Sequence, residues 1–118
     1  MPASILVADD EKGMLNLYSK LFSRTEYSVT MASSFSEAAA LISSNSYDLL
    51  VTDLAFPDGL GTELVKMFEN RRAGARSVVV TGSSPSLART GNNPGTIYFE
   101  KPFKVEAFLA AVSAALSA

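Results

Sequence analysis

Short apolar runs recur along the chain and predict five β-strands. Three of them, residues 5–8, 49–52 and 78–81, show almost no polar alternation, which indicates strands buried on both faces. Residues 27–31 alternate apolar and polar positions, as a strand does when only one face is covered, so we expect them at a sheet edge. Residues 97–99 supply the fifth strand.

Apolar residues at helical spacing predict helices between these strands. The first follows Gly13, Ser34 or Ser36 can cap the second, and Gly74 marks the exit from the third. Residues 83–95 leave space for little more than one turn, which predicts a short or irregular fourth helix. The apolar stripes are Met14, Leu17, Tyr18, Leu21 and Phe22; Ala38, Ala39, Leu41 and Ile42; Leu64, Val65 and Phe68; and Val105, Phe108, Leu109, Val112 and Leu116.

Strands that alternate with helices predict an α/β protein with a doubly wound five-stranded parallel sheet. No repeat or second apolar cluster interrupts the pattern, so we expect one domain over residues 1–118. In such open sheets the ligand site lies beyond the carboxyl ends of the strands.

Composition narrows the chemistry. The net charge of -2 gives no general attraction to nucleic acid or to anionic lipid, and we expect neither partner. No cysteine is present, which excludes a disulfide framework and a thiol nucleophile and fits a cytoplasmic location. No histidine is present either, so any reaction must use carboxylates, hydroxyls, amines and backbone groups.

Polar side chains follow four of the predicted strands. Asp9 and Asp10 end the first strand, Asp53 the third and Thr81 the fourth, and Lys101 follows the fifth. In a parallel sheet these ends share one edge. Three carboxylates against one ammonium group leave unbalanced negative charge, which a divalent cation would neutralise. Oxygen ligands of this kind suit Mg²⁺, with Mn²⁺ also possible.

A metal at this edge would make phosphoryl transfer possible. Asp53 could act as nucleophile and carry an acyl phosphate, Lys101 could neutralise its oxygens, and Thr81 could donate a hydrogen bond. Each residue alone has a simpler interpretation: Asp9 with Asp10 as a helix-capping pair, Thr81 as a strand residue and Lys101 as a surface amine. Their placement at four matching strand ends favours the site.

The chain resembles the receiver domains of two-component response regulators over nearly its whole length. The matching residues are Asp9-Asp10, Asp53 followed by Pro57 and Gly61, Thr81-Gly82, and Tyr98 three positions before Lys101-Pro102-Phe103. The resemblance implies a flavodoxin-like or CheY-like sheet with strand order 2-1-3-4-5. It also implies a switch in a phosphorelay that catalyses its own phosphorylation and dephosphorylation and has no independent metabolic activity.

Site roles follow from this resemblance. Asp53 is expected to be the phosphoacceptor, and Asp10, Asp53 and the backbone carbonyl of Ala55 are expected to bind Mg²⁺, with Asp9 assisting directly or through water. Lys101 is expected to contact the phosphoryl group and to precede a cis bond to Pro102, and Thr81 with Tyr98 is expected to form the switch.

The resemblance also implies partners. The phosphoryl donor of the family is a phosphohistidine, and this chain has no histidine, so the donor must be a sensor histidine kinase, a histidine phosphotransfer protein or a small phosphodonor. The output is a downstream protein or a fused output domain of unknown identity. Met14, Leu15 and Leu17 cannot all face the core, so one of them is a candidate for donor docking, with plain packing as the simpler interpretation.

Two other functions stay open. One is a phosphorylation-independent interaction module with a receiver fold, and the other is a flavodoxin-like cofactor carrier. The acidic loop of residues 9–13 argues against the second, because it would repel a phosphate without a metal. The chain departs from the family pattern at Phe56, where methionine or leucine is common, and in residues 83–95. The basic residues Lys66, Arg71, Arg72 and Arg76 are expected to complement the dipole of the third helix.

Overall fold

A computed structural model describes residues 2–82 and 95–117 of the chain. The predicted fourth helix falls almost entirely outside these residues. The helices are α1 (Lys12–Phe22), α2 (Phe35–Ser44), α3 (Gly61–Arg71) and α5 (Val105–Ser117) among the described residues. The strands are β1 (Ser4–Ala8), β2 (Ser28–Ala32), β3 (Leu49–Asp53), β4 (Ala55–Phe56), β5 (Gly59–Leu60), β6 (Arg76–Thr81) and β7 (Thr96–Glu100).

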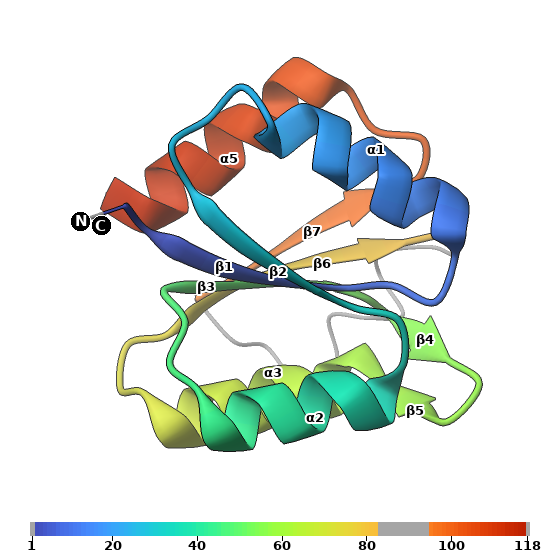
Figure 1. Ribbon diagram of the computed structural model, residues 1–118, viewed down its shortest axis with the longest axis vertical. Helices are drawn as coiled ribbons and strands as arrows, with labels where there is room; N and C mark the ends of the chain where they lie inside the picture. The colour runs from blue at the N-terminus through green and yellow to red at the C-terminus, as the bar shows by residue number, and fades with distance from the viewer. Residues whose placement is uncertain (1, 83–94, 118) are drawn as a thin grey trace.

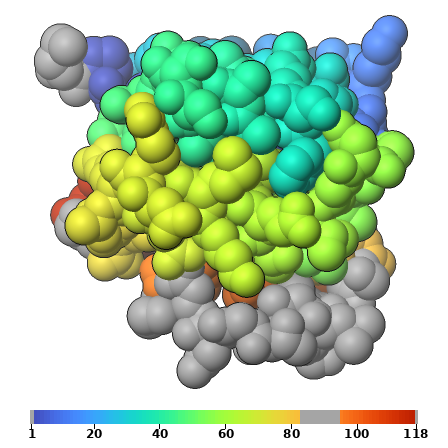
Figure 2. Space-filling model, turned by 90° about the horizontal axis from the view of Figure 1, so that it is seen from below, coloured from blue at the N-terminus to red at the C-terminus, as the bar shows by residue number. Residues whose placement is uncertain are grey.

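Five parallel strands form the main sheet in the order β2-β1-β3-β6-β7. Counted along the chain, these are the five predicted strands in the predicted order 2-1-3-4-5. The alternating strand β2 lies at an edge, as its pattern predicts. Helices α1 and α5 cover one face of the sheet, and α2 and α3 cover the other (Figure 1). Figure 2 looks onto the second face, where α2 and α3 lie side by side.

The core is split by the sheet into two apolar clusters, because successive side chains of a strand point to opposite faces. Ile5 and Val7 of β1 pack in the cluster under α1 and α5, whereas Leu6 packs in the cluster under α2 and α3. The central strands β1 and β3 are buried on both faces, as predicted. None of the described helices is long and apolar enough to cross a membrane.

Helix α2 shows how the sequence fixes an element boundary. Ser34 is the N-cap, and its hydroxyl accepts a hydrogen bond from the backbone N–H of Glu37 at 3.1 Å. The Glu37 carboxylate in turn accepts one from the backbone N–H of Ser33 at 2.7 Å. Of the two predicted caps, the structure therefore selects Ser34 and not Ser36.

A two-stranded ribbon follows β3. β4 and β5 pair antiparallel, and Pro57 with Asp58 forms the connection between them. The Asp58 carboxylate reaches α2 and accepts hydrogen bonds from the backbone N–H groups of Phe35 at 3.1 Å and Ser36 at 3.0 Å. The Ser36 hydroxyl donates a third bond to it at 2.8 Å. The ribbon is thus tied to the N-terminus of α2.

The structure corrects several boundaries. Helix α1 begins at Lys12, so Gly13 lies inside it. Helix α3 ends at Arg71, and Gly74, with φ of 76°, forms the turn into β6. Val105 does not belong to the buried stripe of α5, because it is the first residue of that helix and is 39% exposed.

Arg72 has a partner beyond its own helix. Its guanidinium donates hydrogen bonds to the Asp48 carboxylate at 2.8 Å and to the Tyr47 carbonyl at 2.9 Å. The expected role of this arginine as a complement to the helix dipole stays a prediction, and its charge also joins the end of α3 to the start of β3. Phe56, the residue that departs from the family pattern, is buried against Phe35, with ring centroids 6.5 Å apart.

Candidate functional site

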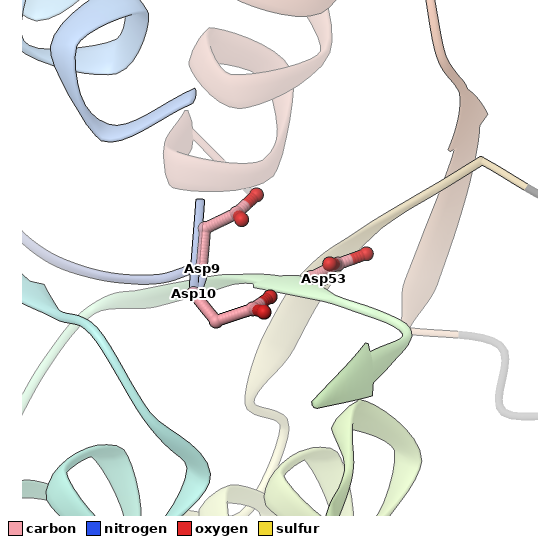
Figure 3. Close-up of side chains that lie close together, drawn as sticks. All are labelled: Asp9, Asp10 and Asp53. Carbon is pink, nitrogen blue, oxygen red and sulfur yellow. The ribbon is translucent and has the colours of Figure 1, made fainter. Parts of the chain in front are cut away.

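Three aspartates meet at the carboxyl edge of the sheet. The register pairs Ala8 of β1 with Thr52 of β3, so the residues that follow, Asp9 and Asp53, end neighbouring strands at the same level. Carboxylate oxygens of Asp9, Asp10 and Asp53 lie within 4.8 Å of one another. Figure 3 shows the three side chains, two from the end of β1 and one from the end of β3. The predicted convergence of these residues is observed.

Backbone amides hold two of these carboxylates in place. Asp9, which is fully buried, accepts a hydrogen bond at Oδ1 from the backbone N–H of Glu11 at 2.9 Å. Asp53, which is 8% exposed, accepts one at Oδ1 from the backbone N–H of Leu54 at 2.8 Å. Asp10 is exposed. The site therefore combines two fixed, shielded carboxylates with one that faces solvent.

Lys101 is the cation of the site. Its Nζ lies 3.5 Å from Asp9 Oδ2, 3.7 Å from Asp53 Oδ2 and 3.4 Å from Glu11 Oε1. The backbone N–H of Lys101 donates to the Thr81 carbonyl at 2.8 Å, which fixes where the chain leaves β7. The Lys101–Pro102 peptide bond is cis. The amine thus contacts two carboxylates, of Asp9 and Glu11, that lie 92 and 90 positions before it in the sequence.

The charges at this edge do not balance. Asp9, Asp10, Asp53 and Glu11 can carry four negative charges, and Lys101 carries one positive charge. Burial raises the pKa of Asp53 to about 6, with a further rise from the negative charge of Asp9, although Lys101 and the Leu54 N–H oppose it. Burial also raises the pKa of Asp9 above its ordinary value.

The pKa of Lys101 is raised although its amine is partly buried. Burial alone would lower the pKa of the amine, but the nearby carboxylates of Asp9, Asp53 and Glu11 outweigh it and raise that pKa. The amine therefore stays protonated at neutral pH. One fixed positive charge beside a shielded carboxylate is suited to neutralising a group that carries several negative oxygens.

The residues present fit a divalent cation. The atoms that could bind a metal here are carboxylate oxygens of Asp9, Asp10 and Asp53, and oxygen is the ligand type that Mg²⁺ prefers. The excess negative charge, expressed in the raised pKa of Asp53, would be relieved by a cation. Ala55 begins β4 two residues after Asp53, so its backbone belongs to the same corner. Magnesium chemistry is therefore compatible with this donor set.

The two expected switch residues lie on neighbouring strands. Thr81 ends β6 and is 2% exposed, and Tyr98 on β7 is half-buried against the cluster under α2 and α3. Val79 of β6 pairs with Tyr98, so residues 79, 81 and 98 share one sheet face. Strand β6, which ends at Thr81, therefore lies between β3, which ends at Asp53, and β7, which carries Tyr98.

Gly61 has a role that spacing alone did not reveal. It is the first residue of α3, and its backbone N–H donates to the Leu54 carbonyl at 2.6 Å. A Cβ atom at this position would overlap the backbone carbonyl oxygen of Asp53. Only glycine permits this approach, so Gly61 sets the path of the chain just after the phosphoacceptor candidate.

Sequence reasoning missed Glu11 as a partner of Lys101. The residue follows Asp9-Asp10 directly, which is the signal that could have identified it. Of the candidates for donor docking, Met14 and Leu15 pack against the core and Leu17 is half-buried. Plain packing thus accounts for the first two.

Comparisons with known proteins agree on one family. Residues 5–113 match the response regulator receiver domain family. A response regulator named MprA from Mycobacterium sp. (strain KMS) is 32% identical over 118 residues, which cover 98% of this chain and 51% of the relative. The DNA-binding transcriptional regulator NtrC of Azospirillum brasilense is 24% identical, with 98% of this chain and 24% of the relative covered. The chain thus spans about a quarter to a half of these relatives.

Solved structures give the same result. A response regulator receiver protein from Sinorhizobium medicae WSM419 superposes with a TM-score of 0.93 at 27% identity, covering 99% of this chain and 96% of that one. A CheY-like receiver domain protein from Methanospirillum hungatei JF-1 superposes with a TM-score of 0.89 at 27% identity, covering 99% and 95%. The predicted fold class and strand order are confirmed.

Proposed function

The chain belongs to the response regulator receiver domain family, and on that premise we propose that Asp53 accepts the phosphoryl group in a magnesium-dependent reaction. The observation that carries the proposal is the Asp53 carboxylate itself. It is shielded from solvent, lies with Asp9 and Asp10 within 4.8 Å, and has the Lys101 amine 3.7 Å from Oδ2. We also propose that the receiver domain extends over residues 1–118.

Asp9, Asp10, Asp53 and the carbonyl of Ala55 are the proposed ligands of Mg²⁺. When bound, the cation would neutralise carboxylate and phosphoryl oxygens and so remove the repulsion between them. The family normally binds Mg²⁺ at such an acidic pocket, and the cluster observed here supports the same assignment.

Nucleophilic attack is the task of Asp53. A carboxylate oxygen forms a bond to phosphorus while the bond between phosphorus and a donor imidazole nitrogen breaks, and the electron pair of that bond stays on the imidazole. A pKa of about 6 leaves Asp53 mostly ionised at neutral pH and more basic than an ordinary aspartate. Lys101 would hold the transferred oxygens by charge-assisted hydrogen bonds.

A switch would follow from the new charge on Asp53. We assign Thr81 as the residue whose hydroxyl turns toward the phosphoryl group, because it ends the strand next to β3. Space near Thr81 would then be open to the ring of Tyr98 on the same sheet face. Partner binding would change because the surface around Tyr98 changes.

Receiver domains of response regulators interact with histidine kinases, and we propose a phosphohistidine on such a kinase or on a phosphotransfer protein as the donor. A fused or separate output partner is part of the same proposal, since the named relatives are regulators longer than this chain. The expected cytoplasmic location stays a prediction. A phosphorylation-independent module stays an alternative, but no described contact favours it over the phosphoacceptor.

The test is phosphorylation by a small phosphodonor with and without Mg²⁺, read by intact mass. Wild-type protein should gain one phosphoryl group that alkali removes, and Asp53→Asn should gain none. Lys101→Ala should react about a hundredfold more slowly, because a group that stabilises developing charge is lost. Lys104→Ala is the matched control, since this nearby lysine is exposed and pairs with no site carboxylate among the described residues. Incorporation that persists in Asp53→Asn would contradict the proposal.

A further inference from the structure

Tyr18 is a buried residue with an unused polar group. It lies on α1 and is 1% exposed, and its hydroxyl makes no hydrogen bond to any residue that the structure describes. Its ring packs against Phe103 with centroids 6.4 Å apart and against Phe108 at 5.7 Å. Apolar packing explains the ring but leaves the hydroxyl unexplained, since a phenylalanine would fill the same space without burying a polar atom.

Tyr18 lies on the helix that begins at the acidic site, and helical geometry tilts its side chain toward that end of the helix. Helix α1 begins at Lys12, directly after Asp9, Asp10 and Glu11. Phe103, which stacks on the ring, comes two residues after Lys101. The ring thus contacts the segment that carries Lys101, and its own helix follows the segment that carries Asp9 and Asp10.

Electrostatics agree with this geometry. Burial raises the pKa of the Tyr18 hydroxyl, and the negative charges of Asp9, Asp53 and Glu11 raise it further, in that order. The hydroxyl therefore lies within the field of the site, with Asp9 exerting the largest effect of the three carboxylates.

Asp9 has room for another hydrogen bond. Its Oδ1 accepts from the Glu11 N–H, and its Oδ2 lies 3.5 Å from Lys101 Nζ. A carboxylate offers about four acceptor positions, so further positions remain on this fully buried side chain. Buried polar groups that find no protein partner are commonly joined by an internal water molecule.

We propose that Tyr18 is a positioning residue for the acidic site, and that one buried water molecule links its hydroxyl to the Asp9 carboxylate. The hydroxyl donates to the water and the water donates to Asp9, which fixes the direction in which this carboxylate faces Asp10 and Asp53. The effect on metal binding rests on the proposed function. The water bridge itself does not.

The first experiment compares Mg²⁺ affinity with stability for Tyr18→Phe, using isothermal titration calorimetry and thermal unfolding without metal. The dissociation constant should rise about tenfold, because partners that orient a metal ligand act on affinity through it. The melting temperature should stay the same or rise, since the ring is kept. Tyr47→Phe is the matched control, because Tyr47 is also buried but lies before β3, at the other end of that strand from Asp53. An unchanged dissociation constant in Tyr18→Phe would overturn the role in positioning.

The second experiment is a crystal structure of the wild-type protein at a resolution that shows ordered water. A water within hydrogen-bond distance of both Tyr18 Oη and Asp9 supports the bridge, and it should be missing in Tyr18→Phe. If the wild-type structure lacks this water, the proposal is overturned. This outcome also decides the case in which Tyr18→Phe loses both Mg²⁺ affinity and stability. If the wild type binds no Mg²⁺, the metal assignment fails, and this structure still decides the water bridge.

Discussion

Asp48 and Asp53 flank the same strand, and their surroundings differ in charge. Asp48, just before β3, accepts hydrogen bonds from the backbone N–H of Ser4 at 2.7 Å and from Arg72 at 2.8 Å. These bonds, that from Arg72 first, lower the pKa of Asp48. Asp53, at the end of β3, lies among further carboxylates with one shared lysine, and burial raises its pKa to about 6. The charge of Asp48 is thus neutralised by its own arginine, whereas Asp53 shares one lysine with Asp9 and Glu11.

The difference separates a structural carboxylate from a reactive one. A carboxylate with its own cation and amide donor joins two segments, here the start of β3 and the end of α3. A shielded carboxylate that shares its cation with other acids gains from any further cation that enters. The contrast therefore predicts effects of opposite sign when the two aspartates are changed.

The largest effect should appear in the pH dependence of stability. The folded-state pKa of Asp53 is about 6, above its ordinary 3.8, so the folded protein binds this proton more tightly than the unfolded chain. Stability should therefore fall as pH rises from about 4 to about 6, by up to about 3 kcal/mol for this group. Urea unfolding should show wild type losing this stability relative to Asp53→Asn. Parallel curves for the two proteins would contradict the raised pKa.

Asp48→Asn is the control for this series, and the sign is reversed. The pKa of Asp48 is lowered in the folded protein, so its contribution is present above the ordinary value and is lost as pH falls through the folded pKa. The free energy of unfolding of Asp48→Asn should therefore change with pH as that of the wild type does between about pH 5 and pH 7, because Asp48 titrates below this range.

Magnesium should stabilise the protein through the carboxyl edge alone. At a Mg²⁺ concentration one hundred times the dissociation constant, the gain is about 2.7 kcal/mol at neutral pH. Thermal unfolding should show this gain in wild type and in Asp48→Asn, and little of it in Asp53→Asn, which lacks one proposed ligand. An equal gain in Asp53→Asn would place the cation elsewhere.

The smallest effect should come from the ion pair of Asp48 and Arg72, at the opposite end of β3 from Asp53. Asp48 and Arg72 have side chains that are 39% and 51% exposed, so solvent screens their attraction. Arg72→Ala should lower the free energy of unfolding by less than about 1 kcal/mol. Phosphorylation by a small phosphodonor should proceed at the wild-type rate, and a slower reaction would show that the two edges are coupled.

The strands and the acidic site could be predicted because their signals are local. Apolar runs such as residues 5–8 and 49–52 mark buried strands, and a parallel sheet places the residues that follow them at one edge. Asp9, Asp53 and Lys101 were found in this way, although Lys101 is far away in the sequence. Topology supplied the contact that spacing could not.

The residues that escaped prediction depend on contacts between distant segments. Nothing near Asp58 shows that its carboxylate reaches the start of α2, and nothing near Arg72 indicates Asp48 as its partner. Tyr18 fits the apolar stripe of its helix, so periodicity predicted that its ring is buried but gave no sign of a separate role for its hydroxyl. The prediction that Val105 is buried was wrong for a related reason. A residue in the first turn can follow the apolar periodicity of its helix while no other element covers it.

The most direct test of the account is the titration of both aspartates by carboxyl ¹³C NMR, with and without Mg²⁺. We predict a midpoint near pH 6 for Asp53 without the metal and a midpoint below the ordinary value for Asp48. Saturating Mg²⁺ should shift the Asp53 midpoint to lower pH and leave Asp48 unchanged. An Asp53 that titrates near pH 4, as an ordinary aspartate does, and ignores Mg²⁺ would contradict the account.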